Sequence, residues 1–314
     1  MDPITDVFTA MRVQSVLYGR IEACAPWGFE AESSPKACFG TVLRGSCWLS
    51  VSGITKQIAL AGGDCFLIAP GRAYAIRDHP LSSTRDITEI VAGQSGKIIH
   101  WGGSGPASTI IGGTFEFDEA SSKPLMELLP ALIHIRADRV RTTGLQTTLQ
   151  LLADETAAPG AGSQVVVNRL ADLLFIHAIR AYIASDECAR TGWLHALSDS
   201  QIGKALRAIH ENLEDSWTVA SLATVAGLSR SAFALRFKQL VGVAPLEYLT
   251  RWRMYKASNL LRDRKVGLAE VAEQVGYYSD AAFNKAFKRV LGMTPGEYRK
   301  TGSLVKAIGA GAAN

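Results

Sequence analysis

The sequence of 314 residues contains no run of about 18 apolar residues, the length that a membrane-spanning helix needs. Its first residues, Met1-Asp-Pro-Ile-Thr-Asp, lack the basic and apolar segments of a secretory signal peptide. Cysteine is scarce, with five residues in all, and no two stand at Cys-x-x-Cys spacing. These absences argue against a membrane protein, a zinc clip and a thioredoxin-like motif, and we expect a cytoplasmic protein.

A repeated pattern near the C-terminus is the most informative feature that is present. Seven residues recur in the same order at an offset of 50 positions. They are Ser229, Phe233, Phe237, Lys238, Gly242, Pro245 and Tyr248, and then Ser279, Phe283, Phe287, Lys288, Gly292, Pro295 and Tyr298. A repeat of this size indicates two copies of one supersecondary unit.

Each copy has the residue pattern of a helix-turn-helix. In the first copy, Thr218 can cap a short helix, Gly227 supplies the turn and Ser229 can cap the next helix. The second copy repeats this plan with Gly276 and Ser279, although its turn is one residue longer. The positions expected inside are Val219, Leu222, Ala223, Ala226, Phe233 and Phe237, and then Leu268, Val271, Ala272, Val275, Phe283 and Phe287.

The segment between the two copies, from Pro245 to Leu261, is expected to form one helix. About seventeen residues at roughly 1.5 Å each give a rod of about 25 Å. A rigid spacer of this kind predicts that the two units enter successive major grooves, roughly 34 Å apart, on one face of a DNA duplex.

The outward positions of the second helix in each unit are candidate DNA contacts, with Asn284 and Lys285 as the best base readers of the second unit and Arg230 and Ser231 of the first. The candidates are Arg230, Ser231, Ala234, Leu235, Lys238, Asp280, Ala281, Asn284, Lys285, Lys288 and Arg289, with Arg253 on the spacer. Residues 201–302 hold 16 Lys and Arg against 9 Asp and Glu, whereas the whole chain holds 33 and 29. The basic excess therefore lies in the region expected to meet phosphate.

These residues make the region from about Gln201 to Lys300 resemble the AraC/XylS-type DNA-binding domain. The matching motifs are Trp217-Thr-Val-Ala-Ser-Leu-Ala, Gly227-Leu-Ser-Arg-Ser-Ala-Phe, Arg251-Trp-Arg-Met and Val275-Gly-Tyr. Members of that family often carry a base-reading arginine where this chain has Leu235. A leucine can contact a thymine methyl group, but it cannot form the bidentate pair that marks guanine.

The first 120 residues have the pattern of short β-strands separated by turn glycines, which predicts a double-sheet roll or barrel. The segments that carry this pattern are Cys38–Gly53, Gln57–Leu60, Gly62–Gly71 and Thr109–Phe117. The predicted fold class is therefore α+β, with an N-terminal β-roll plus helices and an all-α C-terminal domain that holds the two helix-turn-helix units.

The segments Leu43-Arg-Gly-Ser-Cys-Trp-Leu, Gly63-Asp-Cys-Phe-Leu-Ile-Ala-Pro-Gly and Gly112-Gly-Thr-Phe-Glu-Phe-Asp resemble the cupin-type N-terminal domain of some AraC-family regulators. Cupin enzymes hold a metal through histidines, but residues 39–42 contain none and Tyr74 stands where a ligand histidine would be expected. A tyrosine alone does not replace imidazole as a ligand. We therefore expect no metal, no cofactor and no enzymatic activity.

A roll without metal can still bind a small-molecule effector in an apolar cavity, with an arginine to orient it. The candidate pocket residues are Trp27, Phe39, Arg44, Trp48, Phe66, Arg72, Tyr74 and Trp101. The alternative is that most of these aromatic residues simply fill the core.

Four of the five cysteines lie in the same domain, at Cys24, Cys38, Cys47 and Cys65. Some regulators of this architecture sense oxidants through thiols, so a redox switch is one hypothesis for these residues. The other is that they are small buried hydrophobic residues, as strand cysteines in a reducing cytoplasm usually are.

Residues 122–185 carry apolar residues at helical spacing. The expected stripes are Leu125, Leu128, Leu129, Leu132 and Ile133, then Leu145, Leu149 and Leu152, and then Val166, Leu170, Leu173, Leu174, His177, Ala181 and Tyr182. The resemblance implies that such a segment makes a homodimer, and the candidate interface is Leu170, Leu173, Leu174 and His177. Packing of these four residues on the roll is the alternative.

The expected domains are a cupin-like sensing and dimerisation domain at 1–185, whose helical part is about 122–185, a linker at 186–200, a DNA-binding domain at 201–302 and a flexible tail at 303–314. The linker is too apolar to be free, so we expect it to dock on one domain.

The resulting interpretation is a ligand-responsive regulator, such as an activator, that binds double-stranded promoter DNA and RNA polymerase. The alternatives are a thiol-based redox-sensing regulator of the same family, a cupin-type enzyme fused to a DNA-binding module, and an architectural protein that binds DNA without sequence preference.

Overall fold

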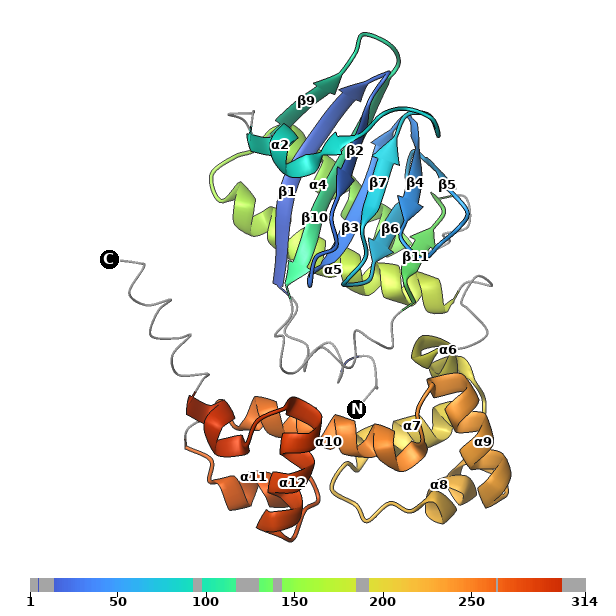
Figure 1. Ribbon diagram of the computed structural model, residues 1–314, viewed down its shortest axis with the longest axis vertical. Coiled ribbons are helices and arrows are strands. Elements are labelled where there is room, and N and C mark those ends of the chain that lie inside the picture. The colour runs from blue at the N-terminus through green and yellow to red at the C-terminus, as the bar shows by residue number, and fades with distance from the viewer. Residues whose placement is uncertain are drawn as a thin grey trace. The chain divides into compact units, whose positions relative to one another are not determined.

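The computed structural model describes residues 5, 14–92, 98–116, 130–137, 143–184, 192–263 and 265–300. The chain folds as two compact units, one that holds the strands with α2, α4 and α5, and one that holds helices α6 to α12. No helix in this described part is both long enough and apolar enough to cross a membrane. The predicted fold class, a β-roll with helices followed by an all-α domain, is confirmed (Figure 1).

Two sheets form the N-terminal roll. The first has the strand order β11-β6-β3-β10-β1-β9 and the second β5-β4-β7-β2-β8. The strands of the first sheet are β1 (Gln14–Cys24), β3 (Ala37–Arg44), β6 (Cys65–Ile68), β9 (Ile98–Gly102), β10 (Ala107–Glu116) and β11 (Leu132–Ile135). Those of the second are β2 (Gly28–Ala31), β4 (Ser46–Val51), β5 (Ile58–Ala61), β7 (Tyr74–Arg77) and β8 (Arg85–Asp86).

The space between the sheets is packed with apolar side chains from both of them. Ile21, Leu49 and Ile76 are among its buried members, and the short helix α2 (Ile87–Ala92) adds Ile90. Alternation of buried and exposed residues along β4 places one face of that strand in this core.

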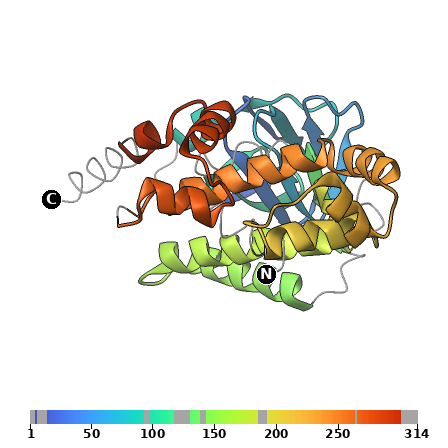
Figure 2. The same cartoon turned by 90° about the horizontal axis from the view of Figure 1, so that it is seen from below.

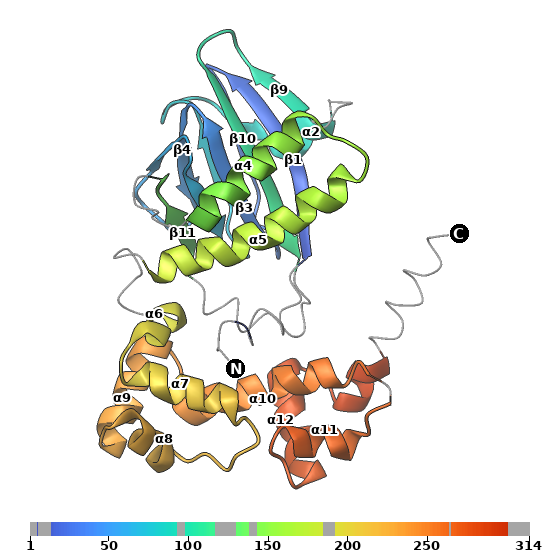
Figure 3. The ribbon, with the colours of Figure 1, turned by 180° about the vertical axis from the view of Figure 1, so that it is seen from behind.

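Helices α4 (Thr143–Ala157) and α5 (Ser163–Ile183) cover the back of the six-stranded sheet, as Figure 3 shows. The contact is aromatic at its centre, where the Phe115 ring of β10 lies 4.7 Å from the Phe175 ring of α5. The predicted helical stripe of α4 is confirmed, since Leu145, Leu149 and Leu152 are all buried.

The structure corrects three details of the predicted helices. Leu132 and Ile133 lie in strand β11, which pairs with β6, and not in a helix. Val166 on α5 and Leu268 on α11 were expected inside but are 43% and 41% exposed. Leu125, Leu128 and Leu129 lie outside the described residues, as does the tail at 303–314.

The helical unit contains α6 (Trp193–Ser198), α7 (Ile202–Glu211), α8 (Val219–Ala226), α9 (Arg230–Val241), α10 (Pro245–Leu260), α11 (Leu268–Gln274) and α12 (Asp280–Leu291). Helix α6 lies in the segment predicted to be the linker, and the Gly192 N–H donates to the Leu240 carbonyl of α9 at 2.7 Å. The described end of that segment therefore docks on the helical unit.

A buried carboxylate ties three parts of the roll together. Asp64 accepts hydrogen bonds from the N–H groups of Ala61 (3.0 Å) and Ala137 (2.8 Å), and its Oδ2 lies 3.2 Å from Nε2 of His134 on β11. Burial alone would raise the pKa of Asp64, but these hydrogen bonds lower it below its ordinary value.

We predict that Asp64→Asn lowers the free energy of unfolding of the roll by about 1–3 kcal/mol at neutral pH, because an amide cannot accept all of these bonds. The depressed pKa means that the carboxylate stabilises the fold above the unfolded-state pKa, about 3.9, and that this contribution is lost as the pH falls through the lower folded-state pKa. Urea unfolding at neutral and acid pH measures both effects. Asp154→Asn, at an exposed position of α4, is the control. A variant as stable as wild type at pH 7 would contradict this role.

Candidate nucleic-acid interface and ligand site

The first helix-turn-helix consists of α8 and α9, and its caps are those that the sequence predicts. Thr218 and Ser221 form a reciprocal capping box at the start of α8, and Gly227 ends this helix in the left-handed conformation at φ 67°. The Ser229 hydroxyl then accepts from the Ala232 N–H at 3.3 Å and starts α9.

The second unit, α11 and α12, repeats this design. Gly276 has φ 74°, and the Ser279 hydroxyl accepts from the Ala282 N–H at 3.4 Å at the start of α12. In both units a left-handed glycine follows the first helix and a serine hydroxyl caps the next one, although the second turn is one residue longer.

A matching set of aromatic rings anchors each of these two helices. In the first unit the Phe233 and Phe237 rings lie 5.5 Å apart, and Phe237 lies 5.8 Å from Tyr248. The corresponding distances in the second unit are 5.7 Å for Phe283 and Phe287 and 5.7 Å for Phe287 and Tyr298. The sequence repeat is therefore a repeat of core packing, and the same face of α9 and of α12 is left outward.

The outward faces carry the residues predicted to contact DNA. All of them are exposed except Ala234, which is half-buried: Arg230, Ser231, Leu235 and Lys238 on α9, and Asp280, Ala281, Asn284, Lys285, Lys288 and Arg289 on α12. Leu235 is 62% exposed, so its side chain is accessible to a thymine methyl group. Each helix carries three basic residues, Arg230, Arg236 and Lys238 on α9 and Lys285, Lys288 and Arg289 on α12, and α12 also carries Asp280.

Arg253 does not belong to this outward set, which corrects its predicted role as a phosphate contact. Its guanidinium group donates to the carbonyl oxygens of Leu213 (2.9 Å), Gly276 (3.2 Å) and Asp215 (2.7 Å). Burial lowers the pKa of Arg253. These donors are used inside the protein and are not available to DNA.

The sequence interpretation also missed Asp199, which holds α9 against the start of α7. Its Oδ1 accepts from the N–H groups of Gln201 (3.0 Å) and Ile202 (2.9 Å), and its Oδ2 accepts from Arg236 at 2.8 Å. Burial would raise the pKa of Asp199, but these bonds lower it. An aspartate just before an apolar helix is a capping signal that could have identified this residue, although its bond to α9 could not be read from the sequence.

The predicted ligand pocket separates into two places. A cavity between the sheets includes Phe39, Phe66 and Tyr74 in its lining, but its volume is only about 30 Å³, little more than one water molecule needs. Arg44 and Trp101 line a different hollow of about 620 Å³ that also includes Arg20, Glu22 and His100. Neither lining includes Trp27, Trp48 or Arg72, and Trp27 lies in the core.

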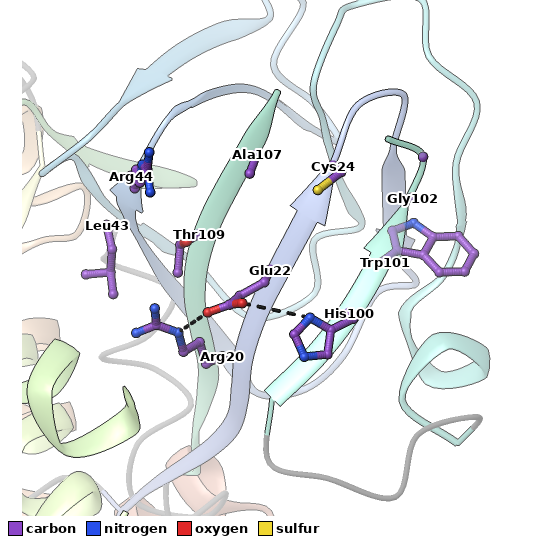
Figure 4. A pocket seen from close by; sticks show the side chains of 11 residues that line it. Arg20, Glu22, Cys24, Leu43, Arg44, His100, Trp101, Gly102, Ala107 and Thr109 are labelled. Atoms are coloured by element: carbon purple, nitrogen blue, oxygen red, sulfur yellow. Dashed lines mark hydrogen bonds and ion pairs between the residues drawn. The ribbon is translucent and has the colours of Figure 1, made fainter. Parts of the chain in front are cut away.

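The larger hollow, which we call the sheet groove, follows one row of paired residues across four strands. Arg44 of β3 is opposite Thr109 of β10, Thr109 is opposite Glu22 of β1, and Glu22 is opposite His100 of β9. Residues paired in this way share one face of a sheet. Figure 4 shows Glu22 between Arg20 and His100, with Arg44 across β10.

Charged groups line the sheet groove on both sides of Glu22. Arg20 Nε donates to Glu22 Oε1 at 2.9 Å, and His100 Nδ1 lies 3.8 Å from Glu22 Oε2. The neighbouring row consists of Cys24, Ala107 and Gly102, whose small side chains create the depression. The lining contains two arginines, Arg20 and Arg44, and one glutamate, Glu22, and Arg44 is exposed. The groove therefore suits an anionic ligand.

The four predicted redox cysteines are free thiols. Burial raises the pKa of Cys38, and it raises those of Cys47 and Cys65 to about 12. A thiol with a raised pKa forms little of the reactive thiolate at neutral pH, which disfavours redox sensing by these three. Cys24 is partly exposed in the sheet groove.

The four predicted dimer residues on α5 are not on one free face. Leu170 and Leu174 are buried within the monomer, and the His177 ring packs against Gly144 of α4. Leu173 is 46% exposed. Packing on the roll, the alternative considered for these residues, therefore applies to Leu170 and Leu174.

Among the residues that the structure describes, no three His, Cys, Asp or Glu side chains come together as a metal ion would require. Tyr74, which stands where a cupin ligand would be expected, lies in the small cavity and hydrogen-bonds to Cys38.

Comparison with known proteins gives matches for both units. A cupin family model matches residues 2–184, and a helix-turn-helix domain model matches residues 222–301. A Streptomyces lividans protein described as an AraC-like transcription regulator is 37% identical over 300 residues, which cover 96% of this chain and 98% of that protein. The HTH-type transcriptional regulator AlkR of Acinetobacter baylyi is 31% identical and covers 96% of this chain and 99% of its own length.

Solved structures are similar to the helical unit. The DNA-binding domain of AdpA, in complex with a target DNA, is 33% identical and covers 33% of this chain and 93% of that chain, with a TM-score of 0.32.

The fold and its outward helices define a DNA-binding protein with paired helix-turn-helix units and a cupin domain. The chain belongs to the AraC-like family of transcription regulators, and its N-terminal domain is a cupin.

Lys285 and Lys238 are expected to respond differently to substitution. Lys285→Ala should relax the preference at one base pair at a cost of about 1–3 kcal/mol, whereas Lys238→Ala should weaken binding to all sequences nearly equally. Affinities for a set of single-base operator variants and for random duplex distinguish these outcomes. Identical effects of both substitutions on specific and random DNA would contradict the assigned roles.

Proposed function

We propose that this regulator reads promoter DNA with α9 and α12 in successive major grooves and responds to a small organic anion bound in its N-terminal domain. The supporting observation is that one helix, α10, carries both units. In its first half, Tyr248 packs on Phe237 of the first unit and Trp252 on His210 of α7, whereas Met254 and Ala257 pack in the core of the second unit. Figure 2 shows α10, in orange, as one continuous helix.

The length of α10 supports docking of both units at once. Its 16 residues span about 24 Å, with the first unit packed on its first half and the second unit on its second half. Equivalent faces of B-form DNA recur roughly every 34 Å, so a rod of this length with a helix-turn-helix at each end can match one turn of the duplex.

The test uses an operator found by genomic footprinting. We expect the full chain to prefer this site over random duplex by about a thousandfold or more at physiological salt. Insertion of about five base pairs between the two subsites turns one of them to the opposite face of the duplex and should abolish most of that preference. Equal affinity for the phased and dephased sites would overturn simultaneous docking, and equal affinity for operator and random duplex would favour an architectural protein.

The effector is assigned to the sheet groove because the cavity between the sheets is already filled. Its walls approach closely, as a Cβ atom at Gly40 would lie 2.3 Å from the Phe66 ring. The sheet groove, at about 620 Å³, has the size of an ordinary small-molecule site. Arg44 and Arg20 would hold a carboxylate, while Leu43 and Trp101 supply apolar surface.

We predict that Arg44→Gln weakens binding of an effector carboxylate about tenfold or more, because a charged hydrogen bond to the ligand is lost. Arg72→Gln removes the same charge from the same domain but lies outside the sheet groove and should have no effect. Calorimetry with a panel of aromatic and aliphatic carboxylates measures both. A loss confined to Arg72→Gln, or no difference between the variants, would overturn this site.

Assembly and further partners are also part of the proposal. Leu173 is on the same face of α5 as the exposed Val166, two helical turns earlier, and exposed apolar side chains on one helix face support a homodimer. Contact with RNA polymerase follows from a role as an activator in the cytoplasm, where bacterial promoters are transcribed.

We propose no enzymatic activity, since the matched relatives are transcription regulators.

A further inference from the structure

On α10, the side chain of Arg253 reaches both the loop that precedes the first helix-turn-helix unit and the turn of the second. Its neighbours on the helix divide between two cores, with Trp252 on the His210 side and Met254 in the second core. The guanidinium group projects between these cores. Its three carbonyl partners lie in two segments of chain that are about 60 positions apart in the sequence.

Two of those carbonyls belong to the loop that leads into the first unit. Leu213 and Asp215 lie in the loop between α7 and α8, and this loop is ordered by its own bonds, including Trp217 Nε1 to the Asn212 carbonyl at 2.7 Å. The guanidinium group therefore donates to a loop that is held by its own hydrogen bonds and that leads directly into α8, the first helix of the first unit.

The third carbonyl belongs to the second unit. Gly276 lies in the turn between α11 and α12, and the next residue, Tyr277, places its ring 5.7 Å from the guanidinium carbon of Arg253. A Cβ atom at Gly276 would lie 2.5 Å from the Glu214 carbonyl oxygen, so the turn of the second unit touches the loop of the first. Gly276 is also left-handed, at φ 74°.

We infer that Arg253 is a positioning residue that sets the angle between α9 and α12 and thereby the operator spacing that the protein accepts. The planar guanidinium group offers five N–H donors in fixed directions, so one side chain can hold both segments at once. Each hydrophobic core fastens its unit to α10 separately. The guanidinium bridge adds a direct polar link between the two units.

This inference rests on the proposed two-groove function, and its test separates the two. Full-length Arg253→Met keeps the length and apolar packing of the side chain but removes all of its donors. Arg251→Met is the matched control, because Arg251 is on the same helix and pairs only locally with Glu247 at 2.6 Å. Each protein is titrated against the operator, against operators with one subsite scrambled, and against operators with one to three base pairs inserted between the subsites.

We expect wild type and Arg251→Met to bind the native spacing best. Arg253→Met should lose about tenfold or more on the native operator, show a flattened spacing preference and keep the affinity of wild type for single-subsite DNA, because the two units no longer act as one preorganised ligand. Arg253→Lys should not restore the preference, since one ammonium group cannot span both segments. Gly276→Ala, which disturbs the same contact from the second unit, should also flatten the preference.

A spacing profile of Arg253→Met that matches wild type would overturn the inference. An equal loss on single-subsite and complete operators would also overturn it, because that result indicates general destabilisation. If wild type itself shows no spacing preference, the two-groove function fails first and the inference fails with it.

Discussion

The sharing of α10 by two hydrophobic cores is the constraint on which the helical unit depends. Tyr248 and Trp252 serve one core, and Met254, Ala257 and Leu261 serve the other, so neither helix-turn-helix has a complete interior without this helix. Since a helix is stiff over this length, packing that stabilises each unit also limits how the two can move. Arg253 restricts the motion that remains, which is a change in the angle between the two units.

In the part of the chain that the structure describes, the N-terminal roll does not enclose a large cavity between its two sheets. The side chains between its sheets pack almost completely, with a cavity of about 30 Å³ remaining. The larger space lies on the face of β1, β3, β9 and β10, where a row with Arg44, Glu22 and His100 runs beside a row of small residues. A sheet can offer a binding surface of this kind because the apolar side chains between the two sheets stabilise the roll, and polar residues can then stand on its other face.

The parts of the structure that could be predicted from the sequence depend on interactions between residues close together in the chain. Thr218, Ser229 and Ser279 act as caps because the groups that they bind are within three residues. The helical spacing of Leu145, Leu149 and Leu152 was also sufficient to predict that these three side chains are buried on one face of a helix. Leu132 and Ile133 were misassigned because a short apolar run suits a helix or a strand, and pairing with β6 decided the outcome. The predicted pocket residues do not line one cavity, because residue type does not reveal which face of a strand meets a cavity.

By itself, the sequence determined the repeated units, their capped helices, the rod between them and the family to which the chain belongs, because periodicity and caps act over a few residues. Only the tertiary structure decided that Arg253 bridges two segments, that Asp199 holds α9, and that the sheet groove follows a row of residues across β3, β10, β1 and β9. These features join residues tens of positions apart. Their partners are chosen when the cores pack and the strands align in register.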